Sequence, residues 1–380
     1  MIYGMIKNNL RCFFKSLIDI IKFNNLPDDQ RSILFYSEGQ NHWPYLSSLV
    51  IISLQKLNKV ICYVTSDIND KGLTLNHKNL KKFYVGNGGT KNYFFNSLKI
   101  DKVVMTMPDL DNYQIKKSKN CKQYIYVQHS LVSLHMAYRN KAFDNFDIFC
   151  CAGPHHRREI KAIEKKYNLK QKKIVNLGYP RLDYLNNIKK NNKSLIKKIL
   201  IAPSWGKNGL IESGLCVKLV EDLLNLKYHV ILRPHPESFK HCPERIKEIN
   251  DKNLSNKSFQ LEKNIINSKN LACSDLLITD WSGIALELFF AFKKPIIYCD
   301  IQKKINNSNY VDIPFIPIEI SLRGKIGTIW DLKQPIDKII NRCQKKRLAN
   351  HTNYINKYVY NIGTSDQMFI KYLKKDFENE

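Results

Sequence analysis

The sequence of 380 residues lacks several patterns that mark common enzyme classes. It contains no G-x-x-x-x-G-K-[ST] loop and no G-x-S-x-G elbow, which disfavours P-loop and serine-hydrolase chemistry. Its ten cysteines form no C-x-x-C pair. Several of them, such as Cys62, Cys150 and Cys299, lie inside apolar runs, where a free thiol behaves as a small hydrophobic group. This usage predicts a reduced, cytoplasmic protein.

Long uncharged apolar runs are also missing. None approaches the roughly 18 residues that cross a bilayer, and the N-terminus lacks the apolar core and cleavage site of a signal peptide. Residues 1–23 instead alternate apolar side chains with Lys7, Arg11, Lys15 and Lys22. This pattern indicates a basic amphipathic helix, which either lies on an anionic membrane or packs its apolar face on the domain.

Acidic residues are few. There are 34 of them against 61 lysines and arginines, which gives a formal net charge of +27. The lysines are scattered, as solvated surface lysines are, but an excess of this size favours an anionic partner. No aromatic-basic RNA-binding signature and no zinc-finger spacing appears. We therefore expect phosphorylated substrates and a membrane surface as partners, and no nucleic acid.

The order of apolar runs predicts an α/β protein. Short apolar strands that alternate with helices indicate parallel sheets covered on both faces. Strands are expected at 32–36, 60–64, 82–85, 102–107, 123–127, 148–152, 174–177, 199–202, 228–232, 276–278 and 296–299, and helices at 45–57, 155–167, 215–226, 243–249 and 284–292. From residue 336 onward the pattern is mostly helical.

A polar, lysine- and asparagine-rich stretch at 186–198 separates two such series and is interpreted as a linker region. The predicted division is an amphipathic helix at 1–30, a Rossmann-like acceptor domain at 31–190, a Rossmann-like nucleotide-donor domain at 191–345, and C-terminal helices at 346–380. Two doubly wound domains would face a cleft, with ligands at the carboxyl ends of the strands.

The strongest local pattern is residues 274–287, where an apolar strand runs through a small-residue turn into a helix. Such a turn places free backbone N–H groups and the positive end of a helix dipole at one spot, which suits a phosphate. Ser282 and Gly283 would wrap the phosphate, and Glu287 would accept ribose hydroxyls. The alternative is that Asp280 and Ser282 only cap the helix. The residues predicted for this part of the site are Thr279, Asp280, Ser282, Gly283 and Glu287.

Two further strand ends in the second half carry polar or aromatic side chains. Arg233 and His235 follow an apolar strand, and the prolines on both sides of His235 fix the backbone and aim its ring. A stiff turn would also use prolines, but it does not call for arginine and histidine. Ser204 and Trp205 follow the first strand of this half, a common place for a phosphate or base contact.

In the first half, His129 ends the fifth predicted strand. A histidine at a strand's carboxyl end is a candidate general base, because its pKa lies near working pH. Glu38 and Gly39 end the first strand, and Arg139 lies near His129 in the sequence; all three are assigned to the acceptor side. The spacing of Asp109 and Asp111 would suit a metal-dependent transferase, but two Rossmann-like halves make that interpretation unnecessary, so no metal and no cofactor is expected.

Five segments together resemble the CDP-glycerol glycerophosphotransferase family, enzymes of teichoic-acid and capsule synthesis with two Rossmann-like domains in GT-B arrangement. They are Gln128-His129, Ala202-Pro203-Ser204-Trp205, Leu232-Arg233-Pro234-His235, Thr279-Asp280-Trp281-Ser282 and Asn361-Ile362-Gly363-Thr364-Ser365. The resemblance implies that His129 is the base, and that His235 and the turn at Asp280 and Ser282 hold the nucleotide pyrophosphate. Family members commonly have Trp-His-Gly where this chain has Gln128-His129-Ser130, and a second serine where it has Gly283.

The predicted function is therefore transfer of glycerol phosphate, or a similar polyol phosphate, from a CDP-activated donor to a hydroxyl of a cell-surface glycan or lipid-linked precursor, with release of CMP. His129 and His235 are the predicted catalytic residues. The protein is expected on the inner face of the cell membrane.

One alternative is an NDP-sugar-dependent glycosyltransferase of surface polysaccharide synthesis on the same fold; another is a basic membrane- or RNA-binding protein. The donor alcohol, the acceptor, the number of units added and the oligomeric state stay open at this stage.

Overall fold

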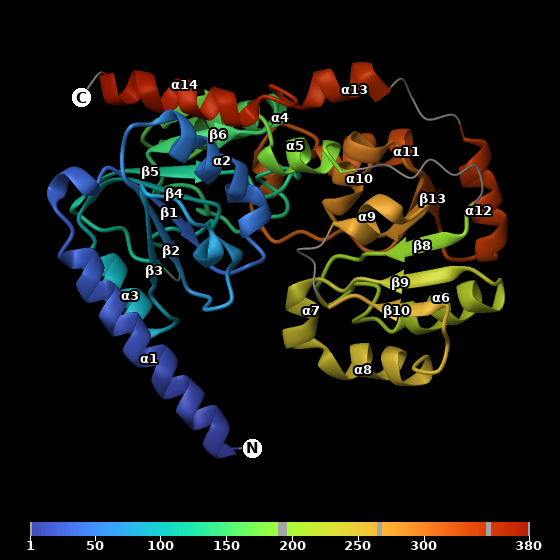
Figure 1. Cartoon of the computed structure of the whole chain (residues 1–380). Helices are drawn as coiled ribbons and strands as arrows, with labels where there is room; N and C mark the ends of the chain where they lie inside the picture. Colours follow the sequence, from blue (N-terminus) through green and yellow to red (C-terminus); the bar gives the residue numbers. More distant parts are fainter. Residues whose placement is uncertain (1, 114, 189–195, 264–267, 347–350, 379–380) are drawn as a thin grey trace. The chain divides into compact units, whose positions relative to one another are not determined.

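The computed structural model describes residues 2–113, 115–188, 196–263, 268–346 and 351–378 (Figure 1). The chain forms two compact units. The first comprises Met1–His129, Arg139–Tyr184 and Val359–Glu380, and the second comprises Ser130–Tyr138 and Leu185–Tyr358. Each unit contains one wholly parallel β-sheet with helices, which confirms the predicted α/β class with two Rossmann-like domains.

The division into units differs from the sequence-based boundaries in several places. The second unit resumes at Leu185, not at 191, and extends to Tyr358, so it includes the first part of the predicted C-terminal segment. The N-terminal helix belongs to the first unit, and the last 22 residues, Val359–Glu380, return to that unit. The short segment Ser130–Tyr138, directly after His129, belongs to the second unit. Most of the predicted linker at 186–198 lies outside the described residues, which omit 189–195.

The first unit is built on a seven-stranded sheet in the order β3-β2-β1-β4-β5-β6-β7. Its strands β1 and β2 are buried along their whole length and β4 at every residue except Asp101, because their side chains are covered on both faces. The strands are β1 (Ile33–Ser37), β2 (Ile61–Thr65), β3 (Leu80–Tyr84), β4 (Ile100–Met105), β5 (Cys121–Val127), β6 (Ile148–Cys151) and β7 (Lys173–Asn176). The helices are α1 (Ile2–Asn24), α2 (Trp43–Lys56), α3 (Gly89–Ser97), α4 (Pro154–Lys166), α5 (Pro180–Asn186) and α14 (Ser365–Glu378), with 3₁₀ turns η1 (Asp28–Gln30) and η2 (Lys71–Thr74).

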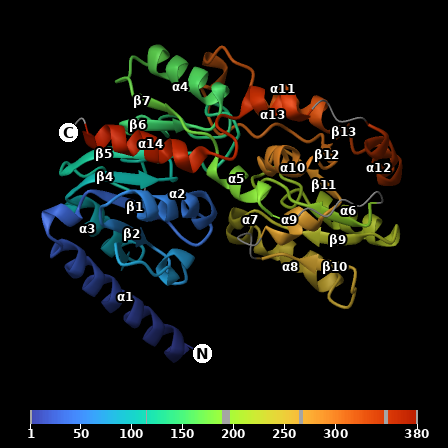
Figure 2. The same ribbon diagram turned by 45° about the horizontal axis from the view of Figure 1, so that its top comes forward.

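The C-terminal helix α14 completes the core of this unit. It packs on α2, as Figures 1 and 2 show, and buries Phe369, Ile370 and Leu373 in the same apolar cluster as Leu46 and Leu49 of α2. Apolar side chains at the spacing of residues 369, 370 and 373 form one stripe along a helix. This stripe explains why α14, at the end of the chain, packs on the N-terminal sheet and its helix α2.

Helix α1 packs only one of its faces on the same unit. Ile20 and Phe23 are buried, and Phe23 makes edge contacts with Phe83 and Phe94 at centroid distances of 5.3 and 5.0 Å. Asp19 accepts a hydrogen bond of 3.0 Å from the backbone N–H of Tyr84. On the helix surface, five large apolar side chains are about half exposed: Leu10, Phe13, Phe14, Ile18 and Ile21. In the part of the chain that the structure describes, no helix is long and apolar enough to span a membrane.

The second unit is built on a six-stranded sheet in the order β10-β9-β8-β11-β12-β13. Its strands are β8 (Lys198–Ile201), β9 (His229–Leu232), β10 (Phe259–Leu261), β11 (Leu276–Thr279), β12 (Ile296–Cys299) and β13 (Thr328–Trp330). Its helices are α6 (Leu215–Asn225), α7 (Pro236–His241), α8 (Pro243–Lys252), α9 (Lys269–Cys273), α10 (Ile284–Phe292), α11 (Ile318–Ile326), α12 (Ile336–Lys345) and α13 (His351–Tyr358), with a 3₁₀ turn η3 (Tyr310–Asp312).

Both sheets reverse their strand order near the middle. In the first sheet the reversal lies between β1 and β4, and in the second it lies between β8 and β11. In open parallel sheets, ligands bind outside the carboxyl ends of the strands at such a point. The loops after β1, β4 and β5, and those after β8, β9 and β11, are therefore where a site is expected.

Candidate active site

In the first unit, His129 lies just beyond the carboxyl end of β5. Its Nδ1 is 3.0 Å from the hydroxyl oxygen of Tyr126, and its carbonyl oxygen accepts a 3.0 Å hydrogen bond from the hydroxyl of Tyr179. The Tyr45 ring meets the imidazole edge to face, with centroids 6.2 Å apart. These contacts orient the ring and engage its Nδ1 atom.

The loops after β1 and β4 place more polar groups beside His129. Glu38 directly follows β1, and its carboxylate is 3.9 Å from Nε2 of His42 and 4.0 Å from Nζ of Lys91. Nδ1 of His42 is 2.8 Å from the hydroxyl oxygen of Thr106, which follows β4. The His42 and His129 rings lie 6.2 Å apart, centroid to centroid. The strand ends of the first sheet thus bring two histidines and a carboxylate together.

Gly39 and Arg139, the other two residues assigned to the acceptor side, make contacts with different residues. Gly39 shapes the turn after β1, where its carbonyl oxygen accepts from the Ser37 hydroxyl at 2.8 Å. Arg139 is exposed and stacks over the Tyr113 ring at 4.6 Å, and its charge lowers the pKa of Asp109, which burial raises more strongly. The structure provides no contact that joins Arg139 to Glu38 among the described residues.

In the second unit, Asp280 joins the ends of two central strands. Its Oδ1 accepts the backbone N–H of Ser204 at 2.6 Å and that of Trp281 at 2.6 Å. Burial raises the pKa of this carboxyl, while the hydrogen bonds from Ser204 and Trp281 act in the opposite direction. Thr279 is also fully buried and donates its hydroxyl to the carbonyl oxygen of Ala202 at 2.7 Å. These two residues hold the strand ends in place.

The turn after Asp280 leaves donors at the start of α10. Among the described residues, the backbone N–H groups of Ser282, Gly283 and Ile284 have no hydrogen-bond acceptor. The N-cap Gly283 supplies no side-chain cap. Unsatisfied N–H groups at the N-terminus of a helix form an anion-binding position. Glu287 lies buried in the first turn of this helix.

The surroundings of Gly283 leave no room for a side chain. A Cβ atom at this position would lie 2.8 Å from Oγ of Ser130 and 2.9 Å from Cγ1 of Val132. These residues belong to the Ser130–Tyr138 segment, which is fixed by a 3.0 Å bond from Ser133 N–H to Glu319. The glycine thus permits close packing of this segment on the turn.

Arg233 and His235, which follow β9, have different surroundings. Arg233 is buried, and its guanidinium lies 3.8 Å from the carboxylate of Glu262, which is also buried. Nδ1 of His235 accepts the backbone N–H of Glu237 at 3.2 Å. A neutral histidine that accepts at Nδ1 carries its proton on Nε2, so Nε2–H of His235 is a hydrogen-bond donor.

Trp205 lies between basic groups. Its ring stacks on His241 at a centroid distance of 5.6 Å, lies 6.1 Å from His235, and has Nζ of Lys304 4.3 Å from its centroid. Burial lowers the pKa of Lys304 to about 8, although the charges of Asp280, Glu212 and Glu237 favour its protonated form. The sequence did not suggest Lys304, which lies in a loop after β12 without a distinctive motif.

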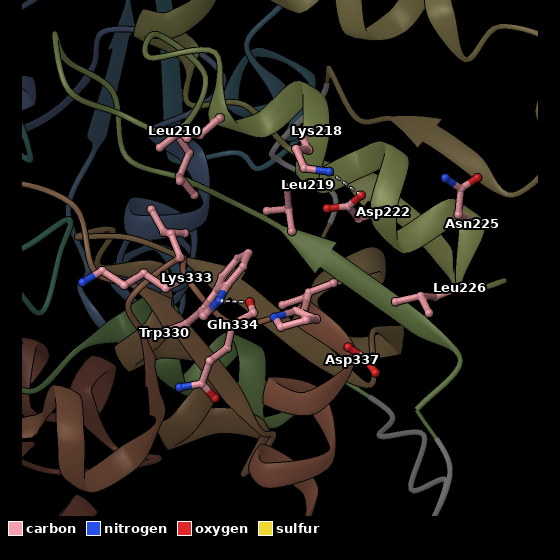
Figure 3. A pocket seen from close by; sticks show the side chains of 14 residues that line it. Leu210, Lys218, Leu219, Asp222, Asn225, Leu226, Trp330, Lys333, Gln334 and Asp337 are labelled. Carbon is pink, nitrogen blue, oxygen red and sulfur yellow. Dashed lines mark hydrogen bonds and ion pairs between the residues drawn. The ribbon is translucent and has the colours of Figure 1, made fainter.

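A cavity of about 540 Å³ opens elsewhere in the second unit (Figure 3). Leucines and Trp330 form much of its lining, and an ion pair between Lys218 and Asp222 of α6 lies at its edge. None of the predicted site residues lines it; its lining is Leu210, Leu215, Lys218, Leu219, Asp222, Asn225, Leu226, Trp330, Leu332, Lys333, Gln334, Pro335, Ile336 and Asp337. No three His, Cys, Asp or Glu side chains among the described residues gather in a way that could hold a metal ion.

The family of the chain follows from a sequence comparison. A model of the CDP-glycerol:poly(glycerophosphate) glycerophosphotransferase family matches residues 87–334, which is more than half of the chain. The chain belongs to this family. It is accordingly an enzyme of the transferase class, as the resemblance predicted. No curated protein sequence matches the chain.

Solved structures share the fold of this glycerophosphotransferase family member. A variant of the wall teichoic acid polymerase TagF is 17% identical, with 98% of each chain covered and a TM-score of 0.57. MnaA of S. aureus in complex with UDP is 13% identical, with 92% of this chain and 97% of that chain covered and a TM-score of 0.59. The UDP-GlcNAc 2-epimerase of Methanocaldococcus jannaschii, with UDP-GlcNAc and UDP, is 16% identical, covers 90% and 99%, and has a TM-score of 0.57. At these identities the comparisons establish the GT-B-like fold.

Proposed function

We propose that this enzyme transfers glycerol phosphate, or a similar polyol phosphate, from a CDP-activated donor to a hydroxyl of a cell-surface glycan or lipid-linked precursor. The family membership supports the donor class. The observation that carries the assignment within the chain is the start of α10, where three neighbouring N–H groups lack an acceptor among the described residues. Such a position suits the diphosphate of the donor.

The reaction requires one bond to form and one to break. The acceptor oxygen attacks the phosphorus that carries the polyol, the bond from this phosphorus to the bridging oxygen breaks, and CMP leaves. The proton of the acceptor hydroxyl passes to Nε2 of His129, in the tautomer whose Nδ1–H donates to the hydroxyl oxygen of Tyr126. The Nε2–H of His235 and the amides of Ser282 and Gly283 would stabilise negative charge on the diphosphate.

The other predicted residues have supporting roles in this proposal. Glu287, in the first turn of α10, would accept the ribose hydroxyls, and Trp205 offers an aromatic face to the nucleotide. Ser204, Thr279 and Asp280 fix the strand ends that carry these groups. Arg233 would contribute positive charge from its buried pair with Glu262.

The donor and the base can be tested together. Purified enzyme is incubated with CDP-glycerol, CDP-ribitol and UDP-sugars, and the release of CMP is compared with the release of UDP. We expect CMP, and a fall in turnover of about 10²–10⁴-fold for His129→Ala. His77→Asn, a change of an exposed histidine, is the matched control. Release of UDP would favour the glycosyltransferase alternative, and near wild-type turnover of His129→Ala with a confirmed CDP donor would exclude His129 as the base.

We also propose that α1 attaches the enzyme to the inner face of the cell membrane. Support comes from the five exposed apolar side chains of this helix and from the neighbouring exposed cations Arg11 and Lys22. Apolar insertion combined with attraction to anionic lipids is the usual mode of such helices. The test is co-sedimentation with vesicles of phosphatidylglycerol. Phe13→Ser with Phe14→Ser should weaken binding, whereas Ile51→Ser, an exposed apolar change on α2, should not; equal binding of all three proteins would contradict the proposal.

A further inference from the structure

His42 is a second histidine of the first unit, held by the ends of two central strands. It lies between β1 and α2, and its Nδ1 is 2.8 Å from the hydroxyl oxygen of Thr106 at the end of β4. Thr106 is buried, with 1% exposure, so the hydroxyl that orients the ring is itself fixed. His42 precedes α2 but its side chain forms no capping hydrogen bond, so capping does not explain its presence.

The Nε2 atom of His42 lacks a hydrogen-bond partner among the described residues. The nearest carboxylate oxygen, on Glu38, is 3.9 Å away, which is too long for a direct hydrogen bond. Burial lowers the pKa of His42 to about 4, so the ring is neutral at pH 7 in spite of this carboxylate. The charged and titratable groups near the pair include Lys91, 4.0 Å from Glu38, the His129 ring, and Tyr36, whose pKa the Glu38 charge raises further above its usual value.

A hydroxyl group matches this pair of side chains. When the Thr106 hydroxyl donates to Nδ1, the neutral ring carries its proton on Nε2 and becomes a donor. A ligand hydroxyl oxygen that lies to one side of the line between Nε2 of His42 and the Glu38 carboxylate can be about 2.8 Å from each. It would then accept a hydrogen bond from Nε2–H and donate one to Glu38. The side chain of Glu38 is 34% exposed, so a ligand can reach it.

The distance to His129 indicates a second hydroxyl. The two imidazole rings are 6.2 Å apart, centroid to centroid. Oxygens on adjacent carbons lie on the order of 3 Å apart, and each needs about 2.8 Å to its own ring nitrogen. Two neighbouring hydroxyls of one ligand can therefore meet the two rings at once.

We propose that His42 and Glu38 bind one hydroxyl of the acceptor beside the hydroxyl that His129 deprotonates, so that the enzyme selects acceptors with two neighbouring hydroxyls. This inference rests on the proposed transferase function and adds the chemical class of the acceptor's reactive end. His42 acts in binding and selection, while the proton goes to His129. A site that hydrogen-bonds a substrate hydroxyl discriminates against an analogue without it, because its polar groups are then left unpaired.

The test compares two acceptors that differ in one hydroxyl. With a CDP-polyol donor, kcat/KM is measured for glycerol 3-phosphate and for 1,3-propanediol monophosphate, which lacks the middle hydroxyl. We expect wild-type enzyme to favour glycerol 3-phosphate by about 10- to 100-fold. His42→Phe should remove this preference by losing activity with glycerol 3-phosphate alone, mainly through KM. Glu38→Gln should show the same selective loss, and His77→Asn should keep the wild-type ratio.

Each outcome separates the two proposals. If CMP is released but wild-type enzyme uses the two acceptors equally well, the acceptor inference is wrong and the transferase proposal stands. The same conclusion follows if CMP is released and neither acceptor is used. If His42→Phe and Glu38→Gln keep the preference, or lose both acceptors in equal proportion with unchanged thermal unfolding, the inference is also wrong. If no CDP-polyol yields CMP, the proposed function itself fails.

Discussion

The backbone amide of Ser204 donates a hydrogen bond of 2.6 Å to Oδ1 of Asp280. Because Ser204 follows β8 and Asp280 follows β11, this bond joins two adjacent central strands where the sheet reverses its order. The same oxygen accepts the N–H of Trp281. Asp280 therefore holds the backbone of both strand ends, and the N–H groups without an acceptor among the described residues belong to the residues after Trp281.

Removal of the Asp280 carboxylate should destabilise the second unit. In Asp280→Ala the N–H groups of Ser204 and Trp281 lose their acceptor, and a buried donor without a partner costs about 1–3 kcal/mol. We expect a loss of about 2–4 kcal/mol in the free energy of unfolding, measured by urea denaturation. Asp280→Asn retains an acceptor oxygen and should lose much less.

The difference in the free energy of unfolding between wild type and Asp280→Asn should change with pH in one direction. Burial raises the pKa of Asp280 in the folded protein above its usual value of 3.8, so the folded state holds this proton more tightly than the unfolded state. Ionisation then lowers the free energy of unfolding as pH rises from about 3.8 through the raised pKa. Asp280→Asn does not titrate, so it should gain stability relative to wild type over this range; a constant difference would contradict the assignment.

Lys304 should leave a pH signature of the opposite sign. Burial lowers its pKa to about 8, so between pH 8 and its ordinary value of 10.5 the unfolded state binds more protons. The free energy of unfolding of wild type should therefore rise in this window relative to Lys304→Met. A shift of this size corresponds to ~3 kcal/mol at most, reduced by residual solvent contact.

The matched control for Lys304 is Lys303→Met, an exposed lysine next to it in the chain. Its stability difference from wild type should stay constant between pH 8 and pH 10.5. The Trp205 ring, 4.3 Å from Nζ of Lys304, provides a second measurement, since its fluorescence should change as the ammonium loses its proton. A fluorescence transition near pH 10.5 instead of near pH 8 would show that Lys304 is not desolvated.

Much of the fold could be predicted because its strands are buried on both faces. Every predicted strand corresponds to one in the structure within about two residues, and the predicted helix at 284–292 matches α10 (Ile284–Phe292). Two strands were missed, β10 and β13. Both are three-residue edge strands in which the middle side chain is exposed, so neither leaves a continuous apolar run in the sequence.

Candidate site residues could be proposed only where a motif lies next to a strand end in the sequence. His129, Asp280 and His235 were proposed in this way, and the structure places each of them after a strand. Neither Thr106 nor His42 was assigned to the site, because strand order, which brings β4 beside β1, cannot be inferred from local spacing. The same holds for the Ser130–Tyr138 segment: its affiliation with the second unit depends on contacts such as Ser133 with Glu319, 186 residues apart.

Gly283 provides a test of that segment. In Gly283→Ala the new Cβ would lie 2.8 Å from Oγ of Ser130 and 2.9 Å from Cγ1 of Val132, closer than real Cβ contacts. We expect a loss of about 1–3 kcal/mol in the free energy of unfolding, as overpacking produces. Because the φ of Gly283 is −62°, backbone strain does not contribute.

Two companion variants make the Gly283 result specific. Gly89→Ala, at a helix start with no atom within 4 Å of the new Cβ, should leave stability within about 0.5 kcal/mol of wild type. Adding Val132→Ala to Gly283→Ala removes one of the two colliding atoms, so the double variant should lose less than the sum of its single losses. Strict additivity of the two changes would mean that Val132 does not pack on Gly283 and that the segment lies elsewhere.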